Sequence, residues 1–160
     1  MNKSFNITLL SVLSLLVFSV VFAFFVEYGL GYKPCKLCLY QRYAYYVSIF
    51  LILNILIFKK YIKPTFMIIA LVSLIGSMIA FYHFGIEQGF FKENLVCEVK
   101  NLDNNLTKED ILKELSTVSI SCKEVAFRVF GLSLASINTI FSFVLFCIFI
   151  KLFKNHEINK

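Results

Sequence analysis

Two cysteines separated by two residues, Cys35 and Cys38, form the part of the sequence best suited to chemistry. Pro34 stands directly before the first cysteine, and long apolar runs lie on both sides of the motif. A Cys-x-x-Cys pair has two common uses, which are reversible disulfide chemistry and half of a zinc site. The motif lies where a membrane helix is expected to begin, so the remaining sequence must distinguish these uses.

The composition favours a membrane protein. The chain has 160 residues, of which 59% are hydrophobic, and a mean hydropathy of +0.78. Soluble domains average roughly 45–50% apolar residues. A separate soluble domain would leave no room for several membrane spans, so we expect a single domain over residues 1–160.

Four apolar stretches are each long enough to cross a hydrocarbon core of about 30 Å. They are residues 7–26, 40–58, 64–84 and 131–152. The first stretch lacks a small-residue cleavage site, so we expect a span and not a removed signal peptide. The sequence therefore predicts an all-α membrane protein, a four-transmembrane-helix bundle with connecting loops at 27–39 and 85–130.

Lysine distribution predicts the orientation in the membrane. Three lysines lie within Lys59–Lys63, and further lysines lie near both termini. Short lysine-rich segments remain in the cytoplasm. Both termini are thus expected in the cytoplasm, with loops 27–39 and 85–130 on the periplasmic side of a bacterial inner membrane. Because the net charge of +6 lies on the cytoplasmic side, the charge gives no support for nucleic-acid binding.

Four of the five cysteines fall in the segments expected outside, where disulfides are stable. Four cysteines allow three pairings, and Cys35–Cys38 with Cys97–Cys122 is the simplest. Zinc sites usually combine two closely spaced pairs, whereas Cys97 and Cys122 lie 25 residues apart, so zinc is disfavoured. The Cys97–Cys122 bridge could be a structural staple. The Cys35–Cys38 loop is too short to restrain the unfolded chain much, which favours a reducible pair.

The outer loop contains a sequence pattern that is typical of a short helix. Thr107 and Asp110 form a helix-start pattern, and Ile111, Leu115 and Val118 make one apolar face. The long outer loop is therefore expected to carry a short amphipathic helix on the membrane surface.

Within the spans, Asn54 and Asn138 are expected to hydrogen-bond between helices. Small residues in the third span would let neighbouring helices approach closely. They are Ser73, Ser77, Gly76 and Ala80. Cys147, deep in the last span, reads as a small apolar residue.

With these residues in place, the chain resembles the DsbB family of inner-membrane, quinone-dependent disulfide-forming proteins. The resemblance covers nearly the whole length. It includes Pro34-Cys35-x-x-Cys38-x-Tyr40-x-Arg42 after the first span, His83 at the end of the third, and Cys97 and Cys122 in the outer loop. At position 41 this chain has glutamine where many relatives have an acid.

The resemblance implies an electron relay. A DsbA-like periplasmic oxidase would form a mixed disulfide with Cys97, and Cys122 would then attack the Cys35–Cys38 disulfide. Cys38 would finally meet a membrane quinone, with ubiquinone favoured over menaquinone. Arg42 and His83 are the candidate quinone-binding residues. Judged from the residues alone, Arg42 could equally be an anchor that reaches the lipid headgroups, and His83 could be a histidine at the membrane–water interface without a role in quinone binding.

Two other classes remain open at this point. A vitamin-K-epoxide-reductase-like thiol oxidase shares the helical bundle and the Cys-x-x-Cys motif, although there the motif follows the loop cysteines. A non-enzymatic membrane scaffold with structural disulfides would instead resist reduction and reduce no quinone.

Overall fold

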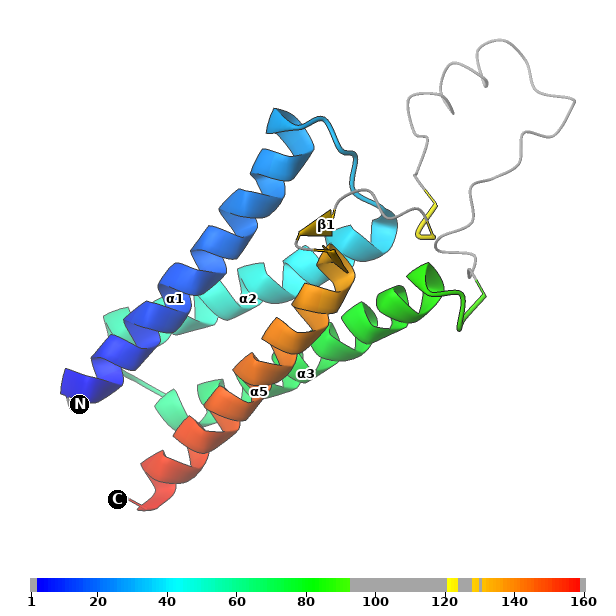
Figure 1. Ribbon diagram of the computed structural model, residues 1–160. Coiled ribbons are helices and arrows are strands. Elements are labelled where there is room, and N and C mark those ends of the chain that lie inside the picture. The colour runs from blue at the N-terminus through cyan, green and yellow to red at the C-terminus, as the bar shows by residue number, and fades with distance from the viewer. Residues whose placement is uncertain (1–2, 93–120, 124–127, 130, 159–160) are drawn as a thin grey trace, which may run out of the picture.

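The structure is a computed structural model that describes residues 3–92, 121–123, 128–129 and 131–158. Long helices make up most of this part of the chain (Figure 1). They are α1 (Lys3–Phe24, continued by a π-helical turn at Phe25–Gly29), α2 (Lys36–Phe58), α3 (Ile62–Glu87) and α5 (Leu134–Ile158). A short antiparallel hairpin of β1 (Arg128–Val129) and β2 (Leu132–Ser133) precedes α5.

All four helices are long and apolar enough to cross a membrane. Large apolar side chains such as Phe50, Ile57 and Met78 are exposed on the outside of the bundle. A helix that is apolar on its outer face suits a lipid environment. The predicted four-helix membrane bundle is therefore confirmed. The predicted amphipathic helix of the outer loop lies outside the described residues.

The bundle has two distinct ends. Figure 1 shows both chain termini and the α2–α3 connection at one end, as the lysine pattern predicts. The start of α2, the end of α3 and the β1–β2 hairpin lie at the other end. The Cys-x-x-Cys motif is thus separated from the termini by the length of the helices.

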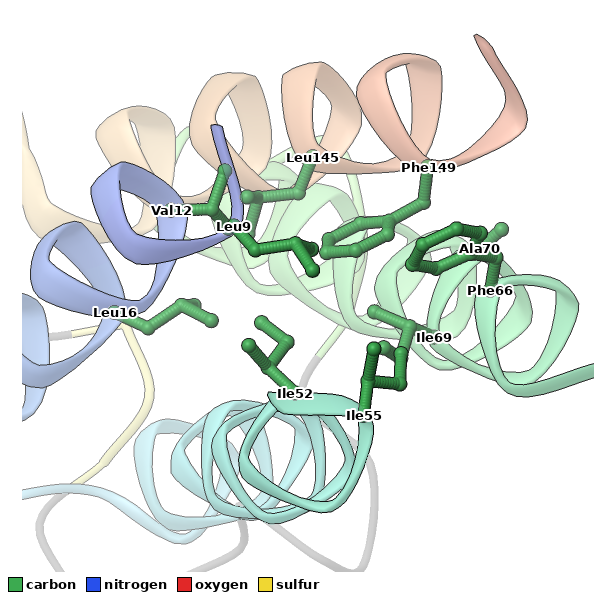
Figure 2. Close-up of a cluster of buried hydrophobic side chains, with 10 residues drawn as sticks. All are labelled: Leu9, Val12, Leu16, Ile52, Ile55, Phe66, Ile69, Ala70, Leu145 and Phe149. Carbon is green, nitrogen blue, oxygen red and sulfur yellow. The ribbon is translucent and has the colours of Figure 1, made fainter. Parts of the chain in front are cut away.

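The apolar core lies toward the end that carries the termini (Figure 2). Every one of the four helices contributes side chains to it, and Phe66 and Phe149 pack ring against ring with centroids 6.0 Å apart. The buried members are Leu9, Val12, Leu16, Ile52, Ile55, Phe66, Ile69, Ala70, Leu145 and Phe149. This packing holds the helices together below the motif.

Small and polar residues bring α3 close to its neighbours, as predicted. A Cβ added at Gly76 would lie 3.3 Å from that of Ala44, and Ser77 Oγ donates to the Thr139 carbonyl at 3.2 Å. The prediction for Asn54 is wrong, because its Nδ2 donates to the Phe50 carbonyl of its own helix.

All four helices begin at residues other than those predicted. α1 begins four residues early, at Lys3, and α3 begins two residues early, at Ile62. α2 begins four residues early, at Lys36, because Cys35 caps it. α5 begins at Leu134, three residues late, since Leu132 pairs with Val129 in the hairpin. Gly131 has a φ of +83°, a left-handed conformation that suits a hairpin turn and not a helix.

Candidate functional site

Cys35 is the N-cap residue of α2. Its Sγ accepts a hydrogen bond from the Cys38 backbone N–H at 3.2 Å, and its carbonyl accepts the first helical hydrogen bond, from Leu39. The N-terminus of a helix carries a partial positive charge, which favours an anion there. The backbone at the start of α2 therefore stabilises the thiolate form of Cys35.

Cys35 and Cys38 are free thiols in this structure, with their sulfurs hydrogen-bonded at 2.8 Å. The Cys35–Cys38 disulfide expected from the sequence is thus not formed here. The hydrogen bond from Cys38 lowers the pKa of the Cys35 thiol from 9.0 to about 5. Burial opposes this shift in the pKa, whereas the hydrogen bond of His83 adds to it. A disulfide needs the sulfurs at about 2.05 Å, so a small movement would close the bond.

His83 joins the third span to the dithiol. Its ring is buried, and Nε2 lies 3.5 Å from Cys35 Sγ. Nδ1 lies 3.2 Å from Gln41 Nε2, which can only donate. Nδ1 therefore acts as the acceptor, and the imidazole hydrogen lies on Nε2, facing the cysteine.

A chain of hydrogen bonds continues from His83 into the bundle. Gln41 Oε1 accepts from Asn138 Nδ2, and Asn138 Oδ1 accepts from the Tyr45 hydroxyl. This confirms the predicted interhelical role of Asn138, which links α5 to two turns of α2. Because each amide is engaged at both ends, the orientation of Gln41 against His83 is fixed.

Glu87 lies one helical turn beyond His83. Its Oε1 is 3.6 Å from His83 Nε2, and both side chains are 5% exposed. Its other oxygen, Oε2, is buried and has no hydrogen-bond partner among the described residues. A buried carboxyl oxygen without a partner is uncommon in folded proteins and calls for an explanation.

Arg42 faces α1. One guanidinium nitrogen is ion-paired with Glu27, the other donates to the Ala23 carbonyl at 3.3 Å, and the group lies 5.3 Å from the centre of the Phe24 ring. The side chain is only 13% exposed. It therefore lies within the protein and does not reach outward as an interfacial anchor would.

Cys122 lies against the dithiol from a distant part of the chain. It is fully buried and disulfide-bonded, while Cys97 lies outside the described residues. Ligand atoms of Cys35, His83 and Cys122 all lie within 4.8 Å of one another. The sequence spacing could not show this convergence. In the disulfide form, however, the Cys122 sulfur is not the thiolate that a zinc ion requires.

A cavity of about 480 Å³ borders these groups. Its polar end contains both thiols of the motif, Gln41, Arg42, His83 and Glu87. Apolar side chains of α1 and α5 form the rest of its wall. They include Phe18, Phe22, Val26, Leu134, Ile137 and Phe141. Such a cavity suits a flat polar ring that carries an apolar tail.

The structure thus brings together five of the six residues singled out in the sequence. Cys147, by contrast, faces outward from α5 and takes no part. Sequence reasoning missed Glu27, Tyr45 and Glu87 as site residues. The four-residue spacing from His83 was a signal for Glu87, but this residue fell in the predicted loop 85–130, because α3 continues three residues beyond the predicted span.

Fold and site together define a multi-span membrane protein with a dithiol beside a buried histidine. The chain belongs to the disulfide bond formation protein DsbB family, whose model matches residues 5–152. It is therefore a membrane disulfide bond formation protein. Membership of this family indicates a role in thiol oxidoreduction. This excludes the vitamin-K-epoxide-reductase-like class.

One of two similar curated proteins carries the same description. The chain is 37% identical over 83 residues to the SPbeta prophage-derived disulfide bond formation protein B of Bacillus subtilis (strain 168), covering 51% of this chain and 53% of that protein. It is 27% identical over 145 residues to an uncharacterized protein of Rickettsia prowazekii (strain Madrid E), covering 89% and 83%. No solved structure matches the chain.

Proposed function

We propose that this protein reoxidises a periplasmic DsbA-like thiol oxidase and passes the electrons to a membrane quinone. The observation that carries the proposal is the position of the dithiol between two features. Cys35 lies within 4.8 Å of the Cys122 sulfur, and both Cys35 and Cys38 line the cavity. Electrons received from Cys122 can thus pass to a molecule bound in the cavity.

The thiol steps follow from disulfide exchange. The reduced donor would attack the disulfide at Cys97 and release Cys122 as a thiolate. Cys122 would then attack Cys35 in the Cys35–Cys38 disulfide and release Cys38. The role of Cys97 rests on the family resemblance. The short distance between the Cys122 and Cys35 sulfurs supports Cys122 as the attacking residue.

The residues around the cavity fit a quinone. When bound, a quinone supplies an acceptor for two electrons and two protons. The apolar walls from α1 and α5 would hold its ring and tail, and Cys38 would face the ring. The Arg42 guanidinium has five N–H donors, and the contacts to Glu27 and Ala23 leave others to bind a carbonyl oxygen. We assign ubiquinone over menaquinone as the natural acceptor.

The orientation in the membrane belongs to the same proposal. The lysine-rich end, with both termini, would lie in the cytoplasm, and the dithiol at the periplasmic face of the inner membrane. Reporter enzymes fused at residue 60 and at the C-terminus should both report the cytoplasm. A periplasmic signal from either fusion contradicts this orientation.

A reconstituted assay tests the proposal. Purified protein is mixed with a reduced DsbA-like donor, and the absorbance of ubiquinone or menaquinone is followed over time. Wild-type protein should oxidise two donor thiols for each quinone reduced. Cys147→Ser serves as the matched control, because this cysteine faces outward and should leave the rate unchanged. If wild-type protein reduces neither quinone, the proposal fails and a scaffold role is favoured.

A further inference from the structure

We propose that Glu87 is a redox-linked proton acceptor, which takes up a proton when the Cys35–Cys38 disulfide is reduced and releases it when the disulfide re-forms. The inference rests on the proposed redox cycling of this cysteine pair. It does not depend on which molecule finally accepts the electrons.

The His83 ring faces two ionisable acceptors and also makes a hydrogen bond with the backbone of Cys122. His83 Nε2 lies 3.5 Å from Cys35 Sγ and 3.6 Å from Glu87 Oε1. Gln41 occupies Nδ1, so Nε2 holds the only hydrogen that a neutral ring can donate. A single donor satisfies a thiolate or a carboxylate well, but it does not satisfy both at once.

The surroundings of Glu87 make a second anion costly. The carboxyl lines the cavity, and Oε2 lacks a partner among the described residues. The Ser133 hydroxyl of β2 is a hydrogen-bond partner of the Glu87 carboxyl and also contacts the Ser136 hydroxyl at 2.9 Å. The ionisable groups that face it are His83, Cys35, Cys38 and the exposed Arg128 of β1. Two anions on one buried imidazole repel each other without enough compensation.

The charges balance if the anion moves from Glu87 to Cys35 on reduction. In the oxidised site Cys35 is a neutral disulfide sulfur, and Glu87 is the carboxylate that accepts from Nε2. A dithiol reductant then delivers two electrons and two protons. One proton goes to Cys38, the other goes to Glu87, and Cys35 becomes the thiolate that accepts from Nε2. The site keeps the same net charge throughout, while His83 only exchanges its hydrogen-bond acceptor.

The exchange equilibrium with dithiothreitol tests this step. In the wild-type protein all protons of the reductant stay in the site, so the equilibrium constant should be independent of pH between about pH 6 and 8. In Glu87→Gln the second proton goes to the medium. The equilibrium constant for reduction of the protein should then increase about tenfold for each unit by which the pH is raised. The redox state of the Cys35–Cys38 peptide is measured by differential alkylation and mass spectrometry.

Glu27→Gln is the matched control, because Glu27 is a partly buried acid near the site that is ion-paired with Arg42. This variant should remain independent of pH. If Glu87 had only a structural role, Glu87→Gln would change the value of the equilibrium constant but would not make it depend on pH. A flat profile in Glu87→Gln, or a tenfold slope already present in the wild type, overturns the proposal.

Infrared spectroscopy gives a second measurement. The reduced-minus-oxidised difference spectrum should gain the carbonyl stretch of a protonated carboxylic acid in wild type and Glu27→Gln, and lose this band in Glu87→Gln. If the pair cycles with dithiothreitol but no such band appears, the Glu87 proposal alone is wrong. If the pair cannot be reduced and reoxidised, the proposed relay is wrong as well. Failure of quinone reduction with normal cycling affects only the proposed function.

Discussion

The two ends of the bundle use the same four helices in opposite ways. Toward the termini, Leu, Ile and Phe side chains interdigitate and fill the space (Figure 2). At the end with the Cys-x-x-Cys motif, the helices leave a cavity of about 480 Å³ bordered by thiols, amides, a histidine and an acid. The filled end fixes the helices, so that the hollow end can keep buried polar groups in defined positions.

The apolar end of the bundle is expected to determine its stability, and the polar end its redox chemistry. Substitutions at the apolar end should affect unfolding and spare the redox properties. Substitutions at the polar end should do the opposite, except where they leave a buried polar group without a partner.

The largest expected effect comes from the dithiol itself. Cys38→Ser removes the sulfur that lines the cavity and must release electrons there. Quinone reduction should fall to background, while the protein should unfold at the same temperature because a hydroxyl fills nearly the same space. Absorbance of the quinone and thermal unfolding in detergent measure the two. A rate equal to that of the wild type would show that electrons leave by another path.

A substitution in the core tests the opposite end. Phe149→Ala removes a fully buried ring that packs on Phe66. It should lower the free energy of unfolding by about 3–5 kcal/mol. At temperatures where the variant remains folded, the pH dependence of Cys35 alkylation should not change. A changed alkylation profile would mean that the two ends are coupled.

The reactivity of Cys35 should depend on pH in a defined direction. Because its pKa is lowered to about 5, the thiolate is present above that pH and is lost below it. The rate of alkylation by iodoacetamide should reach half its plateau near pH 5 in a wild-type protein with reduced thiols. His83→Ala removes a hydrogen bond to the thiolate, so the midpoint should rise by about one pH unit. A midpoint that stays in place would remove His83 from the stabilisation of the thiolate.

Hydropathy predicted the bundle and its number of spans, and the cysteine pattern pointed to the Cys-x-x-Cys motif, whereas Arg42 and His83 were singled out only through the resemblance to a family. Hydropathy and the cysteine pattern could not predict which helix faces meet, because that depends on the rotation of each helix. The chain from Tyr45 through Asn138 to His83 therefore stayed hidden, although each residue was visible in a span. The early start of α2 was missed for a different reason, since a thiol is an uncommon N-cap.

Arg42 gives a smaller, more specific effect. Arg42→Ala removes the guanidinium donors from the cavity and leaves Glu27 without its partner. The apparent KM for quinone should rise several-fold, while exchange between Cys35–Cys38 and dithiothreitol should stay near the wild-type rate. Arg42→Lys keeps the charge but not the planar fork, so it should recover the KM only in part. An unchanged KM in Arg42→Ala would leave Arg42 as a link between α1 and α2.

The two asparagines within spans provide the finest test, because they differ only in which end of the comparison they serve. Asn138 bridges Gln41 and Tyr45, whereas Asn54 bonds only a carbonyl of its own helix. Asn138→Leu should lower the stability in detergent by about 1 kcal/mol, since it removes the partner of the Gln41 amide oxygen and leaves the Tyr45 hydroxyl with its longer contact to Ser142, at 3.4 Å. Asn54→Leu should be close to neutral, because its side chain faces away from the bundle. Equal effects of the two substitutions would show that the buried chain holds α2 and α5 no more firmly than an ordinary side-chain bond within one helix.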